Sequence, residues 1–150
     1  MVVIRDFTAE DKEAVLAMVD AFYHSPAVDH DIPLAHFADV YDEMCGGGSA
    51  RVRGLAVQQD GKLVGFCALS FSYSTEAGGP VVLIEEAAIL PECRGAGLGQ
   101  ALFAFIQNEY RGKAARLRLE VAPDNTRAMA LYERMGFARL PYIQMISEAF

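Results

Sequence analysis

The residues best suited to chemistry are three glycines at alternate positions, Gly95, Gly97 and Gly99, which follow Arg94. Because glycine has no Cβ, successive amide N–H groups in such a segment can point into one concavity. The helix expected to follow adds its free N–H groups and the positive end of its dipole. Together with the cation of Arg94, these groups predict a pyrophosphate-binding loop. A plain turn would need only one or two glycines and no arginine beside them.

Two other phosphate-binding loops fit this segment less well. A Walker A loop requires Gly-Lys followed by Ser or Thr, which Leu98-Gly99-Gln100 does not provide. The dinucleotide fingerprint G-x-G-x-x-G would need a glycine where Gln100 stands, although Glu120 lies about 20 residues further on, as that fingerprint requires. The fingerprint also follows the first strand of a βαβ unit, whereas a hairpin and a third strand are expected here. A nicotinamide dinucleotide is therefore the weaker alternative.

The elements that must position this loop can be predicted from apolar spacing and turn residues. Asp60-Gly61 is a pair typical of a type I′ hairpin turn, and the strand from Val81 to Leu90 is apolar on both faces, which indicates a central position. In chain order we expect a short strand at 2–6, helices over 8–23 and 33–44, strands over 52–58, 62–73 and 81–90, a helix over about 97–110, a strand over 116–121, a helix between a cap at Asp124 or Asn125 and Gly136, and a last strand over about 142–147.

This order and two motifs resemble the GNAT superfamily of N-acetyltransferases. Arg94, Gly97 and Gly99 match the phosphate motif R/Q-x-x-G-x-G/A, and the segment from Asn125 to Phe137 closely matches N-x-x-A-x-x-L/F-Y-x-x-x-G-F. The resemblance covers nearly all of the 150 residues, a length that fits one domain, residues 1–150. It implies an α/β (α+β) fold with a mixed central sheet of about six to seven strands, an antiparallel N-terminal part, splayed parallel strands 4 and 5, and helices on both faces.

The resemblance implies acetyl-CoA as cosubstrate and no metal. A primary amine would attack the thioester directly in a ternary complex, and the protein would be an N-acetyltransferase. The pantetheine arm would bind strand residues like an added strand, and the pyrophosphate would bind the glycine loop. The residues expected to hold the cofactor are Ala87, Ala88, Ile89, Arg94, Gly95, Ala96, Gly97, Leu98, Gly99, Gln100 and Asn125.

Two adjacent glutamates, Glu85 and Glu86, are the candidates for the general base. An alkyl amine with a pKa of about 10.4 is only about one part in a thousand free base at pH 7, so a carboxylate must take its proton, directly or through water. Adjacent strand residues point to opposite faces, so at most one should face the cleft unless a bulge intervenes. By the resemblance, this strand carries a bulge and an acidic residue. We favour Glu85, with Glu86 close behind, and expect the other to pair with an arginine under a helix.

Tyr132 is the candidate general acid. Its apolar helix face fits a core residue equally well, but the resemblance implies that its phenol protonates the leaving thiolate.

The charge is divided unevenly along the chain. Residues 1–50 have a net charge of −8 and residues 51–150 a net charge of +1, which leaves no basic face for nucleic acid. Since the resemblance places acceptor binding near the N-terminal helices, we expect a small cationic amine there, with Asp39 and Glu43 close together on a helix. The acids fit a role in solubility equally well. A protein or peptide acceptor and a CoA-binding sensor without turnover are the alternatives.

The remaining residues exclude several other classes. The three cysteines form no C-x-x-C pair, and the histidines, six residues apart, do not have zinc spacing. The longest apolar run is far short of the ~20 residues of a transmembrane helix, and a charge at Arg5 comes too early for a signal peptide. We therefore expect no metal, no membrane contact and a cytoplasmic setting. A homodimer is compatible with the sequence.

Overall fold

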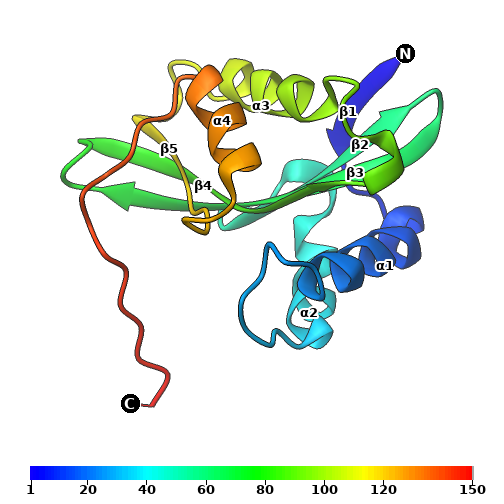
Figure 1. Ribbon diagram of the computed structural model, residues 1–150, viewed down its shortest axis with the longest axis horizontal. Coiled ribbons are helices and arrows are strands. Elements are labelled where there is room, and N and C mark those ends of the chain that lie inside the picture. The colour runs from blue at the N-terminus through cyan, green and yellow to red at the C-terminus, as the bar shows by residue number, and fades with distance from the viewer. Residues whose placement is uncertain (150) are drawn as a thin grey trace.

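Five strands form one mixed sheet with helices on both faces in the computed structural model, which describes residues 1–149 (Figure 1). The strand order is β1-β2-β3-β4-β5, antiparallel except for the parallel pair β4 and β5. The elements are β1 (Val2–Asp6), α1 (Lys12–Tyr23), α2 (Leu34–Met44), β2 (Val52–Gln59), β3 (Lys62–Ser74), β4 (Gly79–Ile89), α3 (Leu98–Glu109), β5 (Arg116–Leu119) and α4 (Thr126–Arg134). The predicted fold class is confirmed, with five strands in the described residues in place of six to seven.

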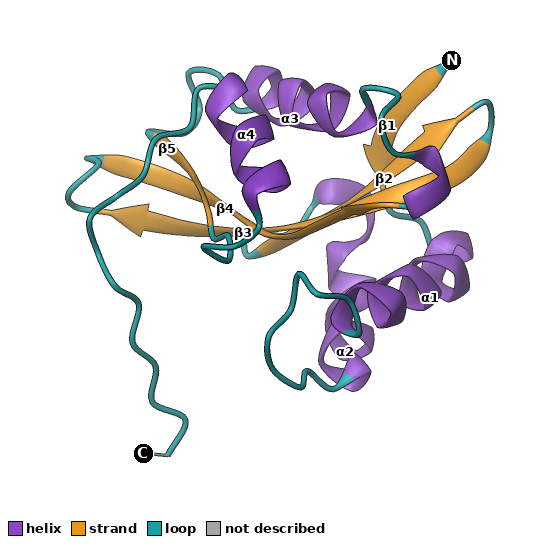
Figure 2. Cartoon of the chain, in the orientation of Figure 1, coloured by secondary structure: helices purple, strands orange, loops and turns teal. Residues whose placement is uncertain are grey.

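The predicted last strand over 142–147 is wrong in this structure. Residues 138–149 have no regular secondary structure, and they leave α4 to run past the β3–β4 hairpin as an extended segment (Figure 2). Tyr142 donates from its hydroxyl to Glu76 (3.2 Å), but Ile143, Met145 and Ile146 are 84–92% exposed. The alternating apolar pattern thus describes an extended chain, whereas a strand also requires a neighbouring edge with which to pair.

The hairpin between β2 and β3 forms as its turn residues predict. Asp60 (φ 51°) and Gly61 (φ 79°) both have positive φ, which is the requirement of a type I′ turn. This turn joins β2 to β3 as antiparallel neighbours, and β3 in turn pairs with β4 on its other side.

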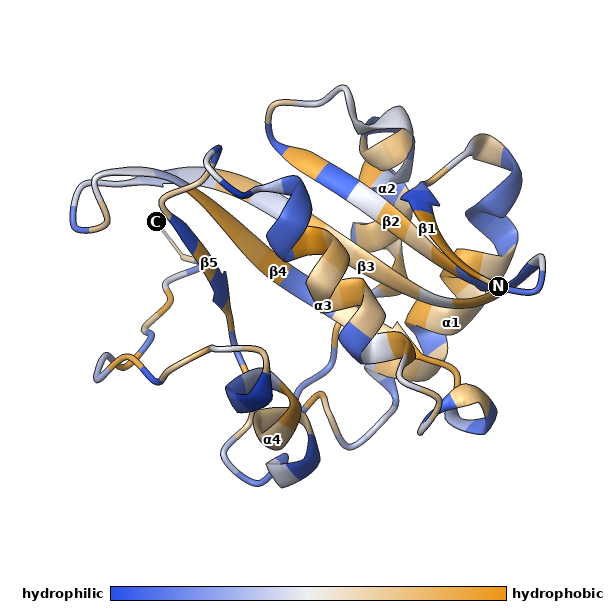
Figure 3. Ribbon diagram, turned by 90° about the horizontal axis from the view of Figure 1, so that it is seen from above, coloured by the Kyte–Doolittle hydropathy of each residue, from blue (hydrophilic) through white to orange (hydrophobic). Residues whose placement is uncertain are grey.

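Each face of the sheet carries its own core. On one face, α1 and α2 pack over Phe66 and Ala68; on the other, α3 and α4 pack over Leu69 and Ile84. Figure 3 shows hydrophobic residues along β3 and β4 where α3 crosses them. The strand predicted to be covered on both sides, β4, is therefore central, and its end lies between the two helical layers.

Arg53 connects three elements beneath α3. From β2, its Nε donates to Asp6 Oδ1 in β1 (2.6 Å), and its Nη1 donates to Glu109 Oε1 (3.3 Å) and to the hydroxyl of Tyr110 (3.2 Å). The Arg53 side chain is 13% exposed, so these bonds are partly shielded from water, and they hold the end of α3 against the β1 edge.

Replacing Arg53 by methionine should lower the free energy of unfolding by about 1–3 kcal/mol, because Asp6 is left without its charged partner. Arg51 provides the control, since its ion pair with Glu43 is 79% exposed on the arginine side and Arg51→Met should cost about 0–1 kcal/mol. Urea unfolding measures both, with an unchanged slope expected for each variant. Equal losses would contradict a structural role for the Arg53 network.

Candidate active site

The strands β4 and β5 separate at the middle of β4. They pair only between Val81–Ile84 and Arg116–Leu119, after which β4 continues to Ile89 while β5 ends. The expected splay of strands 4 and 5 is therefore present. Ala87, Ala88 and Ile89 pair with β3 on one side and, within residues 1–149, have no strand partner on the other. This open edge can accept an extended ligand as an added strand.

The glycine loop lies directly beyond this open edge. Gly95 (φ 85°) and Gly97 (φ 77°) are both left-handed, and Gly97 is the N-cap of α3. Within the described residues, none of the amide N–H groups of 95–100 donates a hydrogen bond. A Cβ built on Gly95 or Gly97 would meet no heavy atom within 4 Å, so the space in front of these amides is open. The loop has the geometry of an anion-binding nest at a helix N-terminus, which fits a pyrophosphate.

Arg94 is held in place beside the loop. Its Nε donates to the carbonyl of Ile89 (2.9 Å), and it forms no ion pair with any carboxylate in residues 1–149. The outer nitrogens of the guanidinium are thus available to an anion.

Gly99 has a second role in helix packing, because a Cβ there would lie 3.2 Å from Leu131 of α4.

A β-bulge places both candidate bases on the same face of the sheet. Ala68 pairs with Glu86 and Leu69 pairs with Ile84, so Glu85 is the extra residue. Glu86 reaches Tyr23 of α1, and Glu85 accepts a hydrogen bond from Ser70 Oγ (2.6 Å). The bulge thereby cancels the alternation that would have sent one glutamate to the α3 side. Both carboxylates lie on the side of α1 and α2.

The two glutamates differ in their surroundings. Glu85 is exposed, whereas Glu86 is half-buried and accepts a hydrogen bond from the Tyr23 hydroxyl at Oε1 (2.7 Å). Burial raises the pKa of Glu86, the bond from Tyr23 lowers it, and the negative charge of Glu85 raises it again. Neither glutamate forms an ion pair in residues 1–149, so the expected arginine partner under a helix is wrong.

Tyr132 lies in α4 on the other side of the splay. Its ring packs against Phe103 (centroids 5.1 Å apart) and Phe137 (6.1 Å). Burial, with a smaller effect from Cys67 of β3, raises the pKa of Tyr132, which keeps the phenol protonated. Asn125 is the N-cap of α4, since its Oδ1 accepts from the amide of Ala128 (3.2 Å). A phenol that holds its proton suits a general acid at this position.

Residues 10–137 match the sequence model of the Acetyltransferase (GNAT) family. The chain belongs to the GNAT acetyltransferase family. This match confirms the resemblance carried by the glycine loop and the Asn125–Phe137 segment.

Two curated acetyltransferases are similar to this chain over part of their length. The streptothricin acetyltransferase of Streptomyces lavendulae is 39% identical over 85 residues, which are 56% of this chain and 43% of that protein. The mycothiol acetyltransferase of Streptomyces griseus subsp. griseus is 37% identical over 81 residues, 53% of this chain and 25% of that protein. The chain thus matches less than half of the length of either relative.

The solved structure of an aminoglycoside N-acetyltransferase in complex with CoA has the same GNAT fold. Its TM-score to this chain is 0.79 at 18% identity, and the superposition covers 99% of this chain and 95% of that one.

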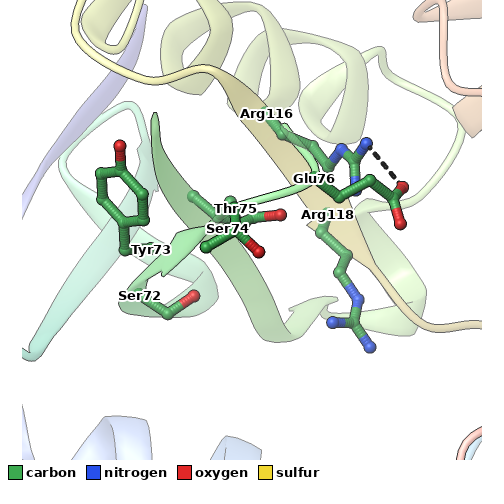
Figure 4. Close-up of a pocket in the computed structure, with 8 residues that line it drawn as sticks. Ser72, Tyr73, Ser74, Thr75, Glu76, Arg116 and Arg118 are labelled. Carbon is green, nitrogen blue, oxygen red and sulfur yellow. Dashed lines mark hydrogen bonds and ion pairs between the residues drawn. The ribbon is translucent and has the colours of Figure 1, made fainter. Parts of the chain in front are cut away.

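A cavity of about 350 Å³ opens at the outer end of the same sheet in this GNAT chain (Figure 4). Ser72 and Ser74 of β3 line it together with Arg116 and Arg118 of β5. Arg116 donates to Glu76 (3.2 Å), whereas the guanidinium of Arg118 points away from that pair in Figure 4. The side chains that β3 and β5 contribute to the cavity are therefore polar or charged.

Four of the ten acids of residues 1–50 form ion pairs with Arg or Lys among the described residues. Asp6 pairs with Arg53, Asp42 with Lys12, and Glu43 accepts from both Arg51 and Ser49. The net charge of −8 counted for residues 1–50 therefore leaves out Arg53 and Arg51, which neutralise Asp6 and Glu43. Within residues 1–149, Glu85 and Glu86 form no ion pair, and they directly follow Ile84, where the pairing of β4 with β5 ends.

Two partners of the site were missed by the sequence analysis. Tyr23 falls on the apolar face of α1, and Ser70 lies within a strand, so neither stands out by residue type. Among the described residues, no three His, Cys, Asp or Glu side chains gather as metal ligands. No helix in that part of the chain is long and apolar enough to span a membrane.

Proposed function

We propose that residues 1–150 form one N-acetyltransferase domain, which transfers the acetyl group of acetyl-CoA to a primary amine of a small cationic molecule. Direct attack occurs in a ternary complex. The observation that carries this proposal is the row of free amide N–H groups at residues 95–100, beside the open edge of β4. Every α-helix leaves its first four N–H groups without an intrahelical partner, here those of residues 97–100, and the loop adds the free amides of Gly95 and Ala96 directly before them.

The loop and the open strand edge would hold the two ends of the cosubstrate. The amides of Gly95, Ala96, Gly97, Leu98, Gly99 and Gln100 would bind the pyrophosphate, with Arg94 adding a positive charge. The backbone of Ala87, Ala88 and Ile89 would pair with the pantetheine amides, and Asn125 would stand near the same arm from the start of α4. Acetyl-CoA supplies the activated acyl group.

Two side chains would move the protons. We assign the base to Glu86 in place of Glu85, because Glu86 is half-buried and its raised pKa brings it closer to neutral pH, where a base works best. Its carboxylate takes a proton from the attacking amine, and the Tyr132 phenol donates one to the leaving thiolate. Glu85 lies next to it and attracts the ammonium form of the amine.

The proposal of a cationic acceptor rests on these two carboxylates, which have no cationic partner in residues 1–149. Relatives named for streptothricin and for aminoglycosides support a small-molecule acceptor. The paired state of Glu43 argues against its contacting substrate, so the ammonium is placed at the bulge.

A thermal-shift panel of CoA thioesters followed by an amine screen tests the proposed function. Acetyl-CoA should raise the melting temperature, and cationic amines should be acetylated best, with a KM that rises with ionic strength because salt screens the carboxylates. If peptide amino groups are the best acceptors, the protein acetyltransferase alternative holds. Binding of acetyl-CoA without turnover of any amine would favour a sensor.

A further inference from the structure

A single hydrogen bond joins α1 to the bulge of β4. The hydroxyl of Tyr23, the last residue of α1, donates to Oε1 of Glu86 at 2.7 Å across 63 residues of sequence. Tyr23 is 8% exposed and packs in the core between α1, α2 and the sheet. Burial and the two glutamates raise the pKa of its phenol, so Tyr23 remains a donor throughout the working pH range.

The surroundings of Glu86 make this bond its main polar contact. The titratable groups that act on its pKa are Tyr23 from α1 and Glu85 from its own strand, while Glu86 itself raises the pKa of Cys67 in β3. The cross-strand neighbour is Ala68, and no Lys, Arg or His pairs with Glu86 in residues 1–149. Its second oxygen, Oε2, accepts no hydrogen bond in that part of the chain. One oxygen is thus fixed by the protein and the other is left for a ligand.

We propose that Tyr23 is the positioning residue of the catalytic base: it holds Oε1 of Glu86 and so directs Oε2 toward the proton of the attacking amine. The proposal rests on the assignment of Glu86 as base in the proposed function. A carboxylate on a flexible glutamate side chain otherwise samples several rotamers, and fixing one of them brings the reacting atoms together more often.

The bond also sets the ionisation of Glu86. A hydrogen bond to the charged form favours that form, whereas burial and the charge of Glu85 oppose it. Without the Tyr23 hydroxyl only the opposing effects remain, so the pKa of Glu86 rises. Because the base must be deprotonated to act, the acidic limb of the pH profile of kcat/KM then moves to higher pH.

Tyr23→Phe is the direct test. We expect the acidic limb to move upward by about one pH unit and kcat to fall about tenfold, while KM for the amine changes about twofold or less. A carboxyl ¹³C titration, with the Glu86 signal assigned by its loss in Glu86→Gln, should show the same upward shift without any substrate. An unchanged limb and an unchanged titration would overturn the proposal.

Tyr41→Phe is the matched control. Tyr41 is a buried tyrosine of α2 in the same helical layer, and its hydroxyl donates to the carbonyl of Thr8 (2.9 Å) instead of a carboxylate. Both variants lose one part-buried hydrogen bond and should show a similar loss of stability in urea. Only Tyr23→Phe should alter the pH profile, and an equal change in both would reduce Tyr23 to a packing role.

The Glu86→Gln background separates this proposal from the proposed function. Adding Tyr23→Phe to Glu86→Gln should change kcat little further, because the residue being positioned is already inactive. If Glu86→Gln alone keeps full activity, Glu86 is not the base and the positioning role falls with it. If Glu86→Gln is inactive but Tyr23→Phe behaves as wild type, the base stands and only the inference about Tyr23 is wrong.

Discussion

Replacing Glu86 by glutamine should lower kcat/KM for amine acetylation about 10²–10⁴-fold at neutral pH. Glutamine keeps the size of the side chain and can still accept the hydrogen bond of Tyr23, so the bulge and the packing beneath α1 should persist. What is lost is the group that takes the proton. Activity should recover in part at high pH, because the free amine becomes abundant without a base. The measurement is kcat/KM between about pH 6 and 10.

Glu85→Gln is the control for this prediction. Glu85 lies beside Glu86 on the same face but is exposed and bonded to Ser70, so its loss should raise KM for cationic amines more than it lowers kcat. A larger fall in kcat for Glu85→Gln would return the base to the residue that the sequence analysis favours. If neither variant loses activity, ordered water or backbone takes the proton.

The features predictable from the sequence are those fixed by neighbouring residues. Asp60-Gly61 favours a type I′ turn, the cap of the next helix is predicted at Asp124 or Asn125 and is formed by Asn125, and the alternate glycines leave their amides free. Each of these depends on at most a few positions along the chain. The bulge in β4 and the splay of β4 from β5 were predicted from the family resemblance, because both depend on how separate strands pair.

The features that were missed depend on contacts between distant residues. The hydroxyl of Tyr23 finds its acceptor 63 residues later, and helical spacing alone assigns this residue to the core. Glu43 is neutralised by Arg51, which a count ended at residue 50 leaves out. The segment from Tyr142 onward alternates like a strand, yet no partner strand pairs with it in residues 1–149. The alternation of apolar and polar residues alone does not determine whether a segment pairs with another strand.

Replacing Gly97 by alanine should abolish the stabilisation that CoA gives to the protein and raise the Kd for CoA at least about tenfold. The new Cβ would project into the open space before the amides, where the proposed pyrophosphate must approach closely. With φ at 77°, the alanine also costs about 1–2 kcal/mol in the free protein. The affinity is measured by calorimetry, and the stabilisation by the change in melting temperature with and without CoA.

Gly112→Ala separates the anion site from backbone strain. Gly112 has a φ of 73° and open space around its Cβ position, so the strain is the same as at Gly97, but it follows the opposite end of α3, about 20 Å from the loop. Both variants should lower the melting temperature of the free protein by a few degrees, about 2–4 °C for each kcal/mol. Only Gly97→Ala should weaken the binding of CoA. An unchanged Kd for CoA in Gly97→Ala would show that the amides of residues 95–100 do not hold the pyrophosphate, because a methyl group in front of them would obstruct a bound pyrophosphate.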